Sequence, residues 1–503
     1  MSVVMVLLIV VPPLAMLVCA VAPHGVCAAV TALTGIVALV LAAALVPASL
    51  DHTLTALHYL RADALSVVFL LGTCFLYAVV GVYSVGYLSD EARAVRSASA
   101  EEQALFARHS TRFYLGMNAF AWSMICAPLV NDLALLWIAV EITTVVSALL
   151  VALDNTEGAN EAAWKYVLIA SSGLGIALLA TIFMYYAGER VLGEAYDLAL
   201  EPLIAAGGQL PATPVRLAFV LAVVGFGTKV GLFPVHTWLP DAHAEAPTPV
   251  SALLSGSLLA VSFYAILRYY QIAVATLGSR FPQTVLLVFG VLSLLLAALY
   301  LLEQRNIKRL LAYSSIEHMG IIAIGVSFGA PIALTGVLLH ILAHAAAKGS
   351  AFMGAGVLVR KFGTKELDRM ARGIWLLPWS GPMFLAAVFA LSAMPPFGLF
   401  RSEFEIVSGG FAHARNAATV ILVILVNLAF MGLTWATTRI LFQPQPVAPA
   451  GDQPPLGRGE PNRWMVAPVV VGVLVLFVLG VAPPAELVDL LNKGAAELMA
   501  GVP

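Results

Sequence analysis

The 503-residue chain is 61% hydrophobic and only 11% charged. Soluble domains are typically about 45–50% apolar and about 25% charged, so these shares exclude a soluble globular protein and indicate a polytopic membrane protein. The net charge of −2 does not favour any class of partner. Because the chain is a membrane protein, we expect contact with the lipid bilayer and no binding of nucleic acid.

Apolar runs of roughly 18 residues or more are interpreted as membrane spans, and the chain contains about fourteen. The first is preceded by no Lys or Arg, which favours a first span over a signal peptide. The polar stretches between runs are too short to form a core, so we predict one all-α membrane domain. The spans lie near residues 2–22, 26–47, 63–87, 112–130, 132–153, 162–187, 215–233, 250–275, 281–302, 308–328, 331–359, 374–412, 417–442 and 465–483.

Basic residues are unequally divided between alternate loops. The larger group includes Arg93, Arg305 and Arg360, and the smaller group includes Arg61 and Arg268. Because cytoplasmic loops are enriched in Lys and Arg, the larger group predicts the cytoplasmic side, with both termini on the non-cytoplasmic side of the inner (plasma) membrane. Three basic residues remain inside apolar runs: Lys229, Lys348 and Arg401.

The stretch from Gly225 to Pro249 places Lys229 about fourteen residues into an apolar run. A charge at that depth costs at least ~2.5 kcal/mol. Pro234 and Pro240 then interrupt the helix, and broken helices in a bilayer line polar cavities or are buried in protein. We therefore predict that Lys229 belongs to an ion path. The alternative is a lysine that snorkels to the interface.

A second break is predicted in the run from Gly373 to Ala412, because about 39 helical residues at ~1.5 Å each far exceed a ~30 Å bilayer core. Two broken helices, each with a charge near its break (Lys229 and Glu403), are typical of inverted-repeat transporters. We predict a break at Pro395, Pro396 and Gly398, and four segments: helices one to three (1–110), a first inverted five-helix repeat (helices four to eight, 111–275), a second (helices nine to thirteen, 276–442), and a linker with helix fourteen (443–503).

Glu141 lies near the centre of the span from Asp132 to Leu153. An isolated carboxylate there protonates unless a cation lies close. Lys229 is the only basic residue at comparable depth in the first repeat, so we predict an ion pair that opens and closes. The alternative is a static structural pair.

His340, His344 and Lys348 recur every fourth residue. Residues four apart in a helix share one face, so these three form a titratable ladder on the order of 12 Å long. Histidine titrates near neutrality, and burial brings lysine there, as a proton wire requires. The alternative is a set of core histidines satisfied by hydrogen bonds.

Two further positions are expected to extend the ladder. Adjacent residues face different directions, so one of Glu317 and His318 meets it, and we favour His318. Glu403 closes the line at the second break. Arg401 and Glu405 flank Glu403 and are equally suited as salt-bridge partners.

Motifs for bound cofactors are absent from the sequence. It contains no phosphate-binding loop, dinucleotide fingerprint or H-E-x-x-H, and Cys19, Cys27, Cys74 and Cys126 show no C-x-x-C spacing. We expect no cofactor or metal in this chain and no catalysis by it alone. Its free energy then comes from an ion gradient or from partners.

With these residues in hand, the chain resembles the antiporter-like membrane subunits shared by respiratory complex I, membrane-bound hydrogenases and multisubunit Na⁺/H⁺ antiporters. The resemblance implies fourteen helices, two inverted repeats and proton transfer along a central polar axis, and it adds His236 to the predicted path. It rests on Glu141, on 229–243 and 246–254, on the ladder (His340, His344 and Lys348) and on Glu403.

Within that family, residues 313–320 and 395–403 look most like component F of hydrogenase-4, from complexes of the formate hydrogenlyase type. The chain ends soon after its fourteenth span, which favours an inner position in a row of such subunits. Many relatives carry a lysine in the eighth span, where this chain has Ala260. We expect Ser262, Tyr264 and water to link the two halves; the alternative is an interrupted link in a subunit that does not pump.

The resemblance implies a proton-translocating, or sodium-translocating, subunit of a hydrogenase or formate hydrogenlyase complex. Its expected partners are other antiporter-like subunits, small membrane subunits and a peripheral redox arm that holds a NiFe centre and iron-sulfur clusters. Two alternatives remain. One is a subunit of a stand-alone cation/proton antiporter, and the other is a membrane anchor that feeds proton flow to a cytoplasmic enzyme, such as one handling inorganic carbon.

Overall fold

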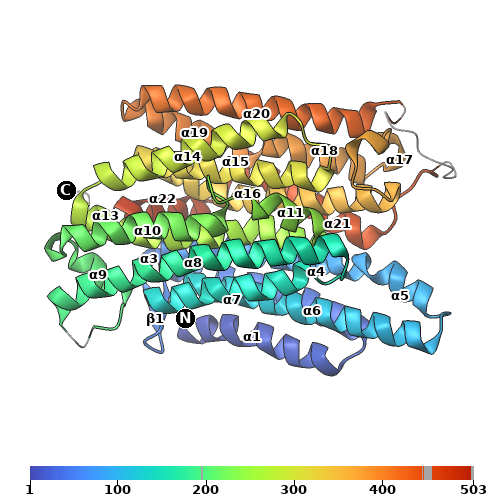
Figure 1. The fold of residues 1–503 in the computed structure, drawn as a ribbon, viewed down its shortest axis with the longest axis horizontal. Coiled ribbons are helices and arrows are strands. Elements are labelled where there is room, and N and C mark those ends of the chain that lie inside the picture. Colours follow the sequence, from blue (N-terminus) through green and yellow to red (C-terminus); the bar gives the residue numbers. More distant parts are fainter. Residues whose placement is uncertain (194–195, 445, 447–455, 500–503) are drawn as a thin grey trace.

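The computed structural model describes residues 1–193, 196–444, 446 and 456–499, and its long helices run along one common direction (Figure 1). The α-helices are α1 (Ser2–Val21), α2 (His24–Ala44), α3 (Val46–Asp51), α4 (Ala64–Tyr87), α5 (Ser89–Val95), α6 (Ala100–Leu129), α7 (Leu133–Val151), α8 (Glu157–Leu192), α9 (Leu200–Ala205), α10 (Ala212–Val230), α11 (Trp238–Glu245), α12 (Thr248–Leu253), α13 (Leu259–Leu277), α14 (Arg280–Leu301), α15 (Ile307–Phe328), α16 (Pro331–Phe362), α17 (Gly373–Leu376), α18 (Ser380–Leu391), α19 (Gly398–Ala412), α20 (Asn416–Phe442), α21 (Arg463–Val481) and α22 (Ala485–Met499). The shorter elements are the antiparallel hairpin β1 (Leu54–Ala56) and β2 (Leu60–Ala62), the 3-10 helices η1 (Gly207–Gln209) and η3 (Leu367–Arg369), and the π-helix η2 (Leu254–Leu258).

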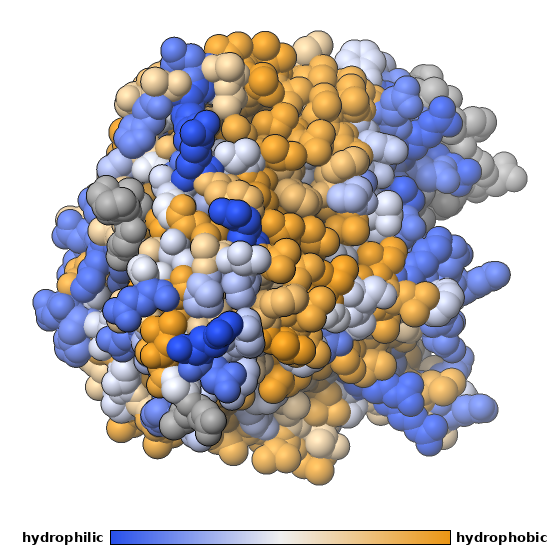
Figure 2. Space-filling view, turned by 60° about the vertical axis from the view of Figure 1, so that its left-hand side comes forward, coloured by the Kyte–Doolittle hydropathy of each residue, from blue (hydrophilic) through white to orange (hydrophobic). Residues whose placement is uncertain are grey.

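The predicted all-α membrane architecture is confirmed. Within the described residues, twelve helices are long and apolar enough to cross a membrane. The other two predicted spans are α6, whose first half is polar, and the interrupted pair α18 and α19. Figure 2 shows a broad apolar band on the surface with hydrophilic residues on either side of it.

Side chains that accept backbone hydrogen bonds fix where several helices begin. Asp63, Ser99, Asp132, Thr156 and Asn306 each accept a bond from a first-turn amide, of α4, α6, α7, α8 and α15 respectively. Such caps satisfy donors that have no partner within the helix. The polar residues between apolar runs therefore have a definite structural role.

The helices divide into a buried centre and a lipid-facing periphery. The spans that contain α4, α12 with α13, α15 and α16 are 83–100% buried, whereas the α1 span is only 28% buried. The ladder lies on α16 and His318 on α15, so the titratable residues belong to the buried centre.

Both predicted helix breaks are confirmed. Helix α10 ends at Val230, Gly231 takes a left-handed φ of 84°, and the short α11 follows. Helix α18 ends at Leu391 and α19 begins at Gly398, with Pro395 and Pro396 in the gap. The inverted relation of the repeats and the four segment boundaries stay predictions.

The C-terminal helix α22 was not predicted from the sequence. It packs against α4 and α16, and the Glu497 carboxylate accepts bonds from the amides of Ala64 and Leu65 (3.1 and 3.0 Å). At the other terminus, the Ser2 hydroxyl donates to the carbonyl of Thr55 in the nearby hairpin. Both termini consequently lie toward the same end of the helices (Figure 1). Which side of the membrane that end faces stays a prediction.

The contact of α8 with α10 depends on glycine. A Cβ atom at Gly225 would lie 2.5 Å from the backbone nitrogen and 2.8 Å from the Cα of Ala177. Small residues allow membrane helices to approach this closely. We expect Gly225→Ala to push the helices apart and to destabilise the protein by about 1–3 kcal/mol, measured by thermal unfolding in detergent.

The matched control is Gly175→Ala on α8, because a Cβ atom there meets nothing within 4 Å. Equal unfolding midpoints for the two variants would contradict the close contact. Because Gly225 lies one turn before Lys229 on α10, the Gly225 variant is also expected to shift the lysine.

Candidate functional site: a buried polar axis

Lys229 is fully buried in the last turn of α10. Its ammonium donates a hydrogen bond to the Thr144 hydroxyl on α7 and lies 5.1 Å from the centre of the Tyr166 ring on α8. The Tyr166 hydroxyl is in turn bonded to Ser147 (2.8 Å). A hydroxyl and an aromatic face therefore hold the charge inside the protein, and the snorkelling alternative is wrong.

Glu141 lies on the same helix as Thr144, one turn earlier. One carboxylate oxygen accepts a bond from the Ser171 hydroxyl (3.0 Å), and the other is buried without a partner. Among the described residues, no ion pair within 4.0 Å joins Glu141 to Lys229. The predicted direct pair is thus open in this structure, because the lysine bonds to Thr144 instead.

Two histidines follow the first break. His236 lies in the loop between α10 and α11 and is nearly buried, with Nδ1 unpartnered. His243 lies on α11, fully buried, and both its ring nitrogens lack partners. Its ring stacks against Phe352 on α16, with centroids 5.5 Å apart. Sequence reasoning assigned His243 no role, because its burial is set by the break and not by helical spacing.

The predicted ladder exists, and its members contact α15. The Lys348 ammonium donates to the Leu311 carbonyl (2.9 Å) and to the Ser314 hydroxyl. His344 is fully buried and neither ring nitrogen has a partner. Its ring centre lies 5.2 Å from that of His318.

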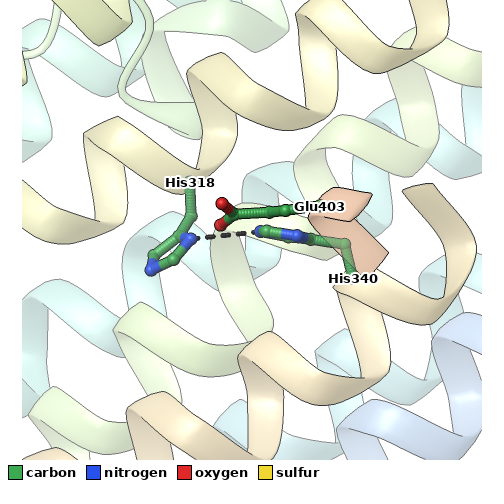
Figure 3. A group of neighbouring side chains, drawn as sticks. All are labelled: His318, His340 and Glu403. Atoms are coloured by element: carbon green, nitrogen blue, oxygen red, sulfur yellow. Dashed lines mark hydrogen bonds between the residues drawn. The ribbon is translucent and has the colours of Figure 1, made fainter. Parts of the chain in front are cut away.

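His318, and not Glu317, is the residue that meets the other ladder histidine. His318 Nδ1 lies 3.1 Å from His340 Nε2 (Figure 3), and His340 Nδ1 lies 3.0 Å from the Ser402 hydroxyl on α19. These contacts join α15, α16 and α19 in one buried line. Ser402 was not predicted, because a helical serine is ordinary in sequence.

The hydrogen bonds assign the neutral histidine tautomers. The Ser402 hydroxyl donates to the Leu399 carbonyl (2.9 Å), so its oxygen accepts the proton on His340 Nδ1. His340 Nε2 is then the acceptor for the proton on His318 Nδ1. This leaves His318 Nε2 as a bare acceptor, and that atom is buried without a partner.

Glu403 is buried beside this line. Its carboxylate lies next to the bond between His318 and His340 (Figure 3), and the three side chains offer atoms within 4.8 Å of one another. Arg401 pairs with Glu405 (3.1 Å). The salt-bridge question is thereby answered, because Arg401 is engaged with Glu405 and Glu403 faces the histidines.

The expected link between the two halves is wrong for Tyr264. Its hydroxyl bonds to Ser66, Arg268 and the Pro128 carbonyl, while the Ser262 hydroxyl donates to the Leu258 carbonyl at the end of η2. A different hydroxyl pair lies near Lys348. Ser255 in the π-helix is 2.6 Å from Ser315 on α15, and Ser315 donates to the same Leu311 carbonyl as Lys348.

Arg268 is a second correction, because it was counted among the loop residues. It is fully buried, and Nη2 donates to Asp63 (2.7 Å), Ser66 (3.0 Å) and Tyr264 (2.8 Å). The Asp63 carboxylate, which caps α4, compensates the buried charge. Hydropathy alone does not distinguish an arginine paired inside the protein from one in a loop.

The fold and this axis define a polytopic membrane protein with a line of buried titratable groups beside two broken helices. Residues 130–430 match the family described as NADH:quinone oxidoreductase/Mrp antiporter, transmembrane, and the chain belongs to this family. The sequence resemblance is thereby confirmed.

Two relatives and two solved structures illustrate the similarity. The chain is 34% identical over 429 residues to a hydrogenase-4 component F homolog of Methylacidiphilum infernorum (85% of this chain and 86% of the relative). It is 31% identical over 376 residues to hydrogenase-4 component B of Escherichia coli (72% and 52%). Its fold matches a chain of the Mrp complex from Dietzia sp. (TM-score 0.82, 20% identity, 100% of both chains) and one of respiratory complex I from Thermus thermophilus (TM-score 0.78, 22% identity, 98% and 99%).

Proposed function

We propose that this chain is a proton-translocating, antiporter-like subunit of a membrane-bound hydrogenase or a related complex I-like assembly. The family membership and the two hydrogenase-4 relatives support this class. The observation that carries the proposal is the buried line from His344 through His318 and His340 to Ser402.

That line suits proton transfer because each histidine has one nitrogen to receive a proton and another to release one. A proton that arrives at the bare Nε2 of His318 permits the proton on Nδ1 to move to His340 Nε2. The proton on His340 Nδ1 then moves to the Ser402 oxygen as Ser402 releases its own hydroxyl proton, and Glu403 beside the line is the group that takes up and unloads a proton. Rotation of the rings, or return of protons, resets the tautomers.

Lys229 and Glu141, in the first predicted repeat, supply the charge that drives this transfer. Lys229 bonded to Thr144 and Glu141 with a bare oxygen represent the separated arrangement. When partner chemistry draws Lys229 and Glu141 together, the positive charge of Lys229 moves from Thr144 toward Glu141. The Ser255 and Ser315 hydroxyls then pass the change toward Lys348, in place of the lysine absent at Ala260.

Other antiporter-like membrane subunits and small membrane subunits are the proposed partners, with a peripheral redox arm of the formate hydrogenlyase type. The NiFe centre and iron-sulfur clusters belong to that arm. The four cysteines of this chain are free and belong to α1, α2, α4 and α6, which does not suit a cluster. The proposed location is the inner membrane, with both termini on the non-cytoplasmic side.

The experiment is redox-driven proton transport in vesicles that contain the purified complex. We expect Lys229→Ala and Glu141→Gln to reduce gradient formation at least about tenfold, since proton transfer by a positioned group is typically worth ~10²–10⁴-fold. The control is Lys165→Ala, a lysine of α8 that lies at the surface with Glu161. A full gradient in both variants, with the complex assembled, would favour a membrane anchor.

A stand-alone cation/proton antiporter is the second candidate, favoured by the fold match to the Mrp complex. The same vesicles distinguish it. An antiporter exchanges protons against an imposed cation gradient without any electron donor, whereas the proposed subunit needs the redox partner to be turning over.

A further inference from the structure

A second property is built into the trio of His318, His340 and Glu403. The three side chains come from α15, α16 and α19, all are buried, and their donor atoms converge within 4.8 Å (Figure 3). We propose that this trio binds a divalent transition cation of the zinc type. No sequence motif predicted the site, because its ligands belong to three separate helices.

The spacing of the two imidazole nitrogens suits such a cation. His318 Nδ1 and His340 Nε2 lie 3.1 Å apart, and two nitrogen ligands at ~2.0–2.1 Å in a tetrahedral zinc site are separated by about 3.3 Å. Two imidazoles and one carboxylate are ligands that Zn²⁺ accepts, with the fourth position left open.

The surrounding hydrogen bonds prepare one ligand. His340 Nδ1 donates to Ser402, as ligand histidines in zinc sites usually donate their second nitrogen to an oxygen, and Nε2 is left with its lone pair toward the site. This bond fixes both the tautomer and the direction of the ring.

His318 has to free its Nδ1 before it ligates. The proton on Nδ1 then moves to Nε2, and that atom is buried without a partner, so it can take the proton. After this change of tautomer, His318 Nδ1 and His340 Nε2 no longer bond to each other and both present a lone pair to the cation. His318 need not become charged.

A cavity beside the trio provides the remaining ligand. It has a volume of about 330 Å³ and is lined mainly by apolar side chains, with Glu403, Ser392 and Asn427 as its polar residues. The Ser392 hydroxyl is itself buried and unpartnered. These polar groups offer hydrogen-bond partners to a water molecule beside Glu403, and a water molecule completes the coordination.

Binding has a consequence for transport, and this consequence rests on the proposed function. The cation occupies the two nitrogens that the hydrogen bond between His318 and His340 joins. It therefore interrupts proton transfer at that bond, and Zn²⁺ acts as an inhibitor whose strength increases as proton concentration falls, because both compete for the imidazoles.

The first test is binding of Zn²⁺ alone to the purified full-length protein in detergent, by competition with a zinc-sensitive dye and by zinc-edge X-ray absorption. We expect one tight site with two imidazole ligands. His318→Gln and Glu403→Gln each weaken it at least about tenfold, and Ser402→Ala weakens it by about tenfold through the orientation of His340. The matched control is His413→Gln, an exposed histidine just beyond α19, which leaves the affinity unchanged.

Transport provides a separate readout. Zn²⁺ is expected to block proton flux in vesicles with the native chain at the concentration that fills the site, and to block it at the same concentration in His413→Gln, whose exposed histidine lies outside the site. Affinity that is unaffected by His318→Gln and Glu403→Gln would overturn the site. Zinc bound by the trio without any block would leave the site standing and overturn the relay through this bond.

Discussion

The variant His340→Gln is expected to lower proton flux by about 10²-fold or more relative to the native complex. This magnitude is typical for loss of a group that transfers protons. His340 is the one residue on the described axis that bonds to both His318 and Ser402, and so connects α15 to α19. Glutamine keeps a donor and an acceptor in place. It does not carry a proton from one side of its side chain to the other, so the hydrogen bonds remain while the relay stops.

Two comparisons separate transfer from structure. Thermal unfolding of His340→Gln in detergent should match that of the native protein, because the Ser402 hydroxyl and His318 Nδ1 still find partners. His413→Gln, which removes an exposed histidine near the end of α19, should leave flux intact. Flux within twofold of the native value in His340→Gln would show that protons bypass the histidines.

The features that sequence reasoning predicted are those set by local rules. Spacing by four residues placed His340, His344 and Lys348 on one face of α16, because the helix geometry is fixed. Excess length and prolines located the break before Gly398. Adjacent helical side chains point about 100° apart, and this predicted that only one of Glu317 and His318 meets the ladder.

The features that were missed depend on tertiary contacts. Thr144, Ser314 and Ser402 hold the charged and titratable groups, yet hydroxyl residues occur throughout membrane helices and carry no spacing signal. The pair of Glu141 and Lys229 was predicted from depth alone, and depth does not reveal that a threonine one turn away competes for the lysine. Only the packing of α7 and α10 against α8 brings these partners together.

The buried cluster around Arg268 is expected to produce the largest loss of stability. Removal of one partner from a buried ion pair typically costs about 3–5 kcal/mol, because the other charge stays buried and loses compensation. In Arg268→Ala, Asp63 keeps Arg61 (2.5 Å) but loses the bond at 2.7 Å, and Gln271 also loses a donor (2.8 Å). The measurement is the free energy of unfolding, or the thermal midpoint in detergent, compared with Arg280→Ala.

Arg280 begins α14, is exposed, and has no ion-pair partner among the residues that the structure describes, so its replacement tests loss of charge without loss of contacts. The double variant Asp63→Asn with Arg268→Met is expected to be less destabilised than the sum of the single changes, since the two fully buried charges are removed together and only Arg61, at the edge of the cluster, loses its partner. The cluster joins α4 to α13, and Gln271 donates to the carbonyl of Glu497 on α22 (2.9 Å). Its loss should therefore release α22 and expose the start of α4, while the distant bond between His318 and His340 persists below the unfolding temperature. Equal midpoints for Arg268→Ala and Arg280→Ala would mean that apolar packing alone holds these three helices together.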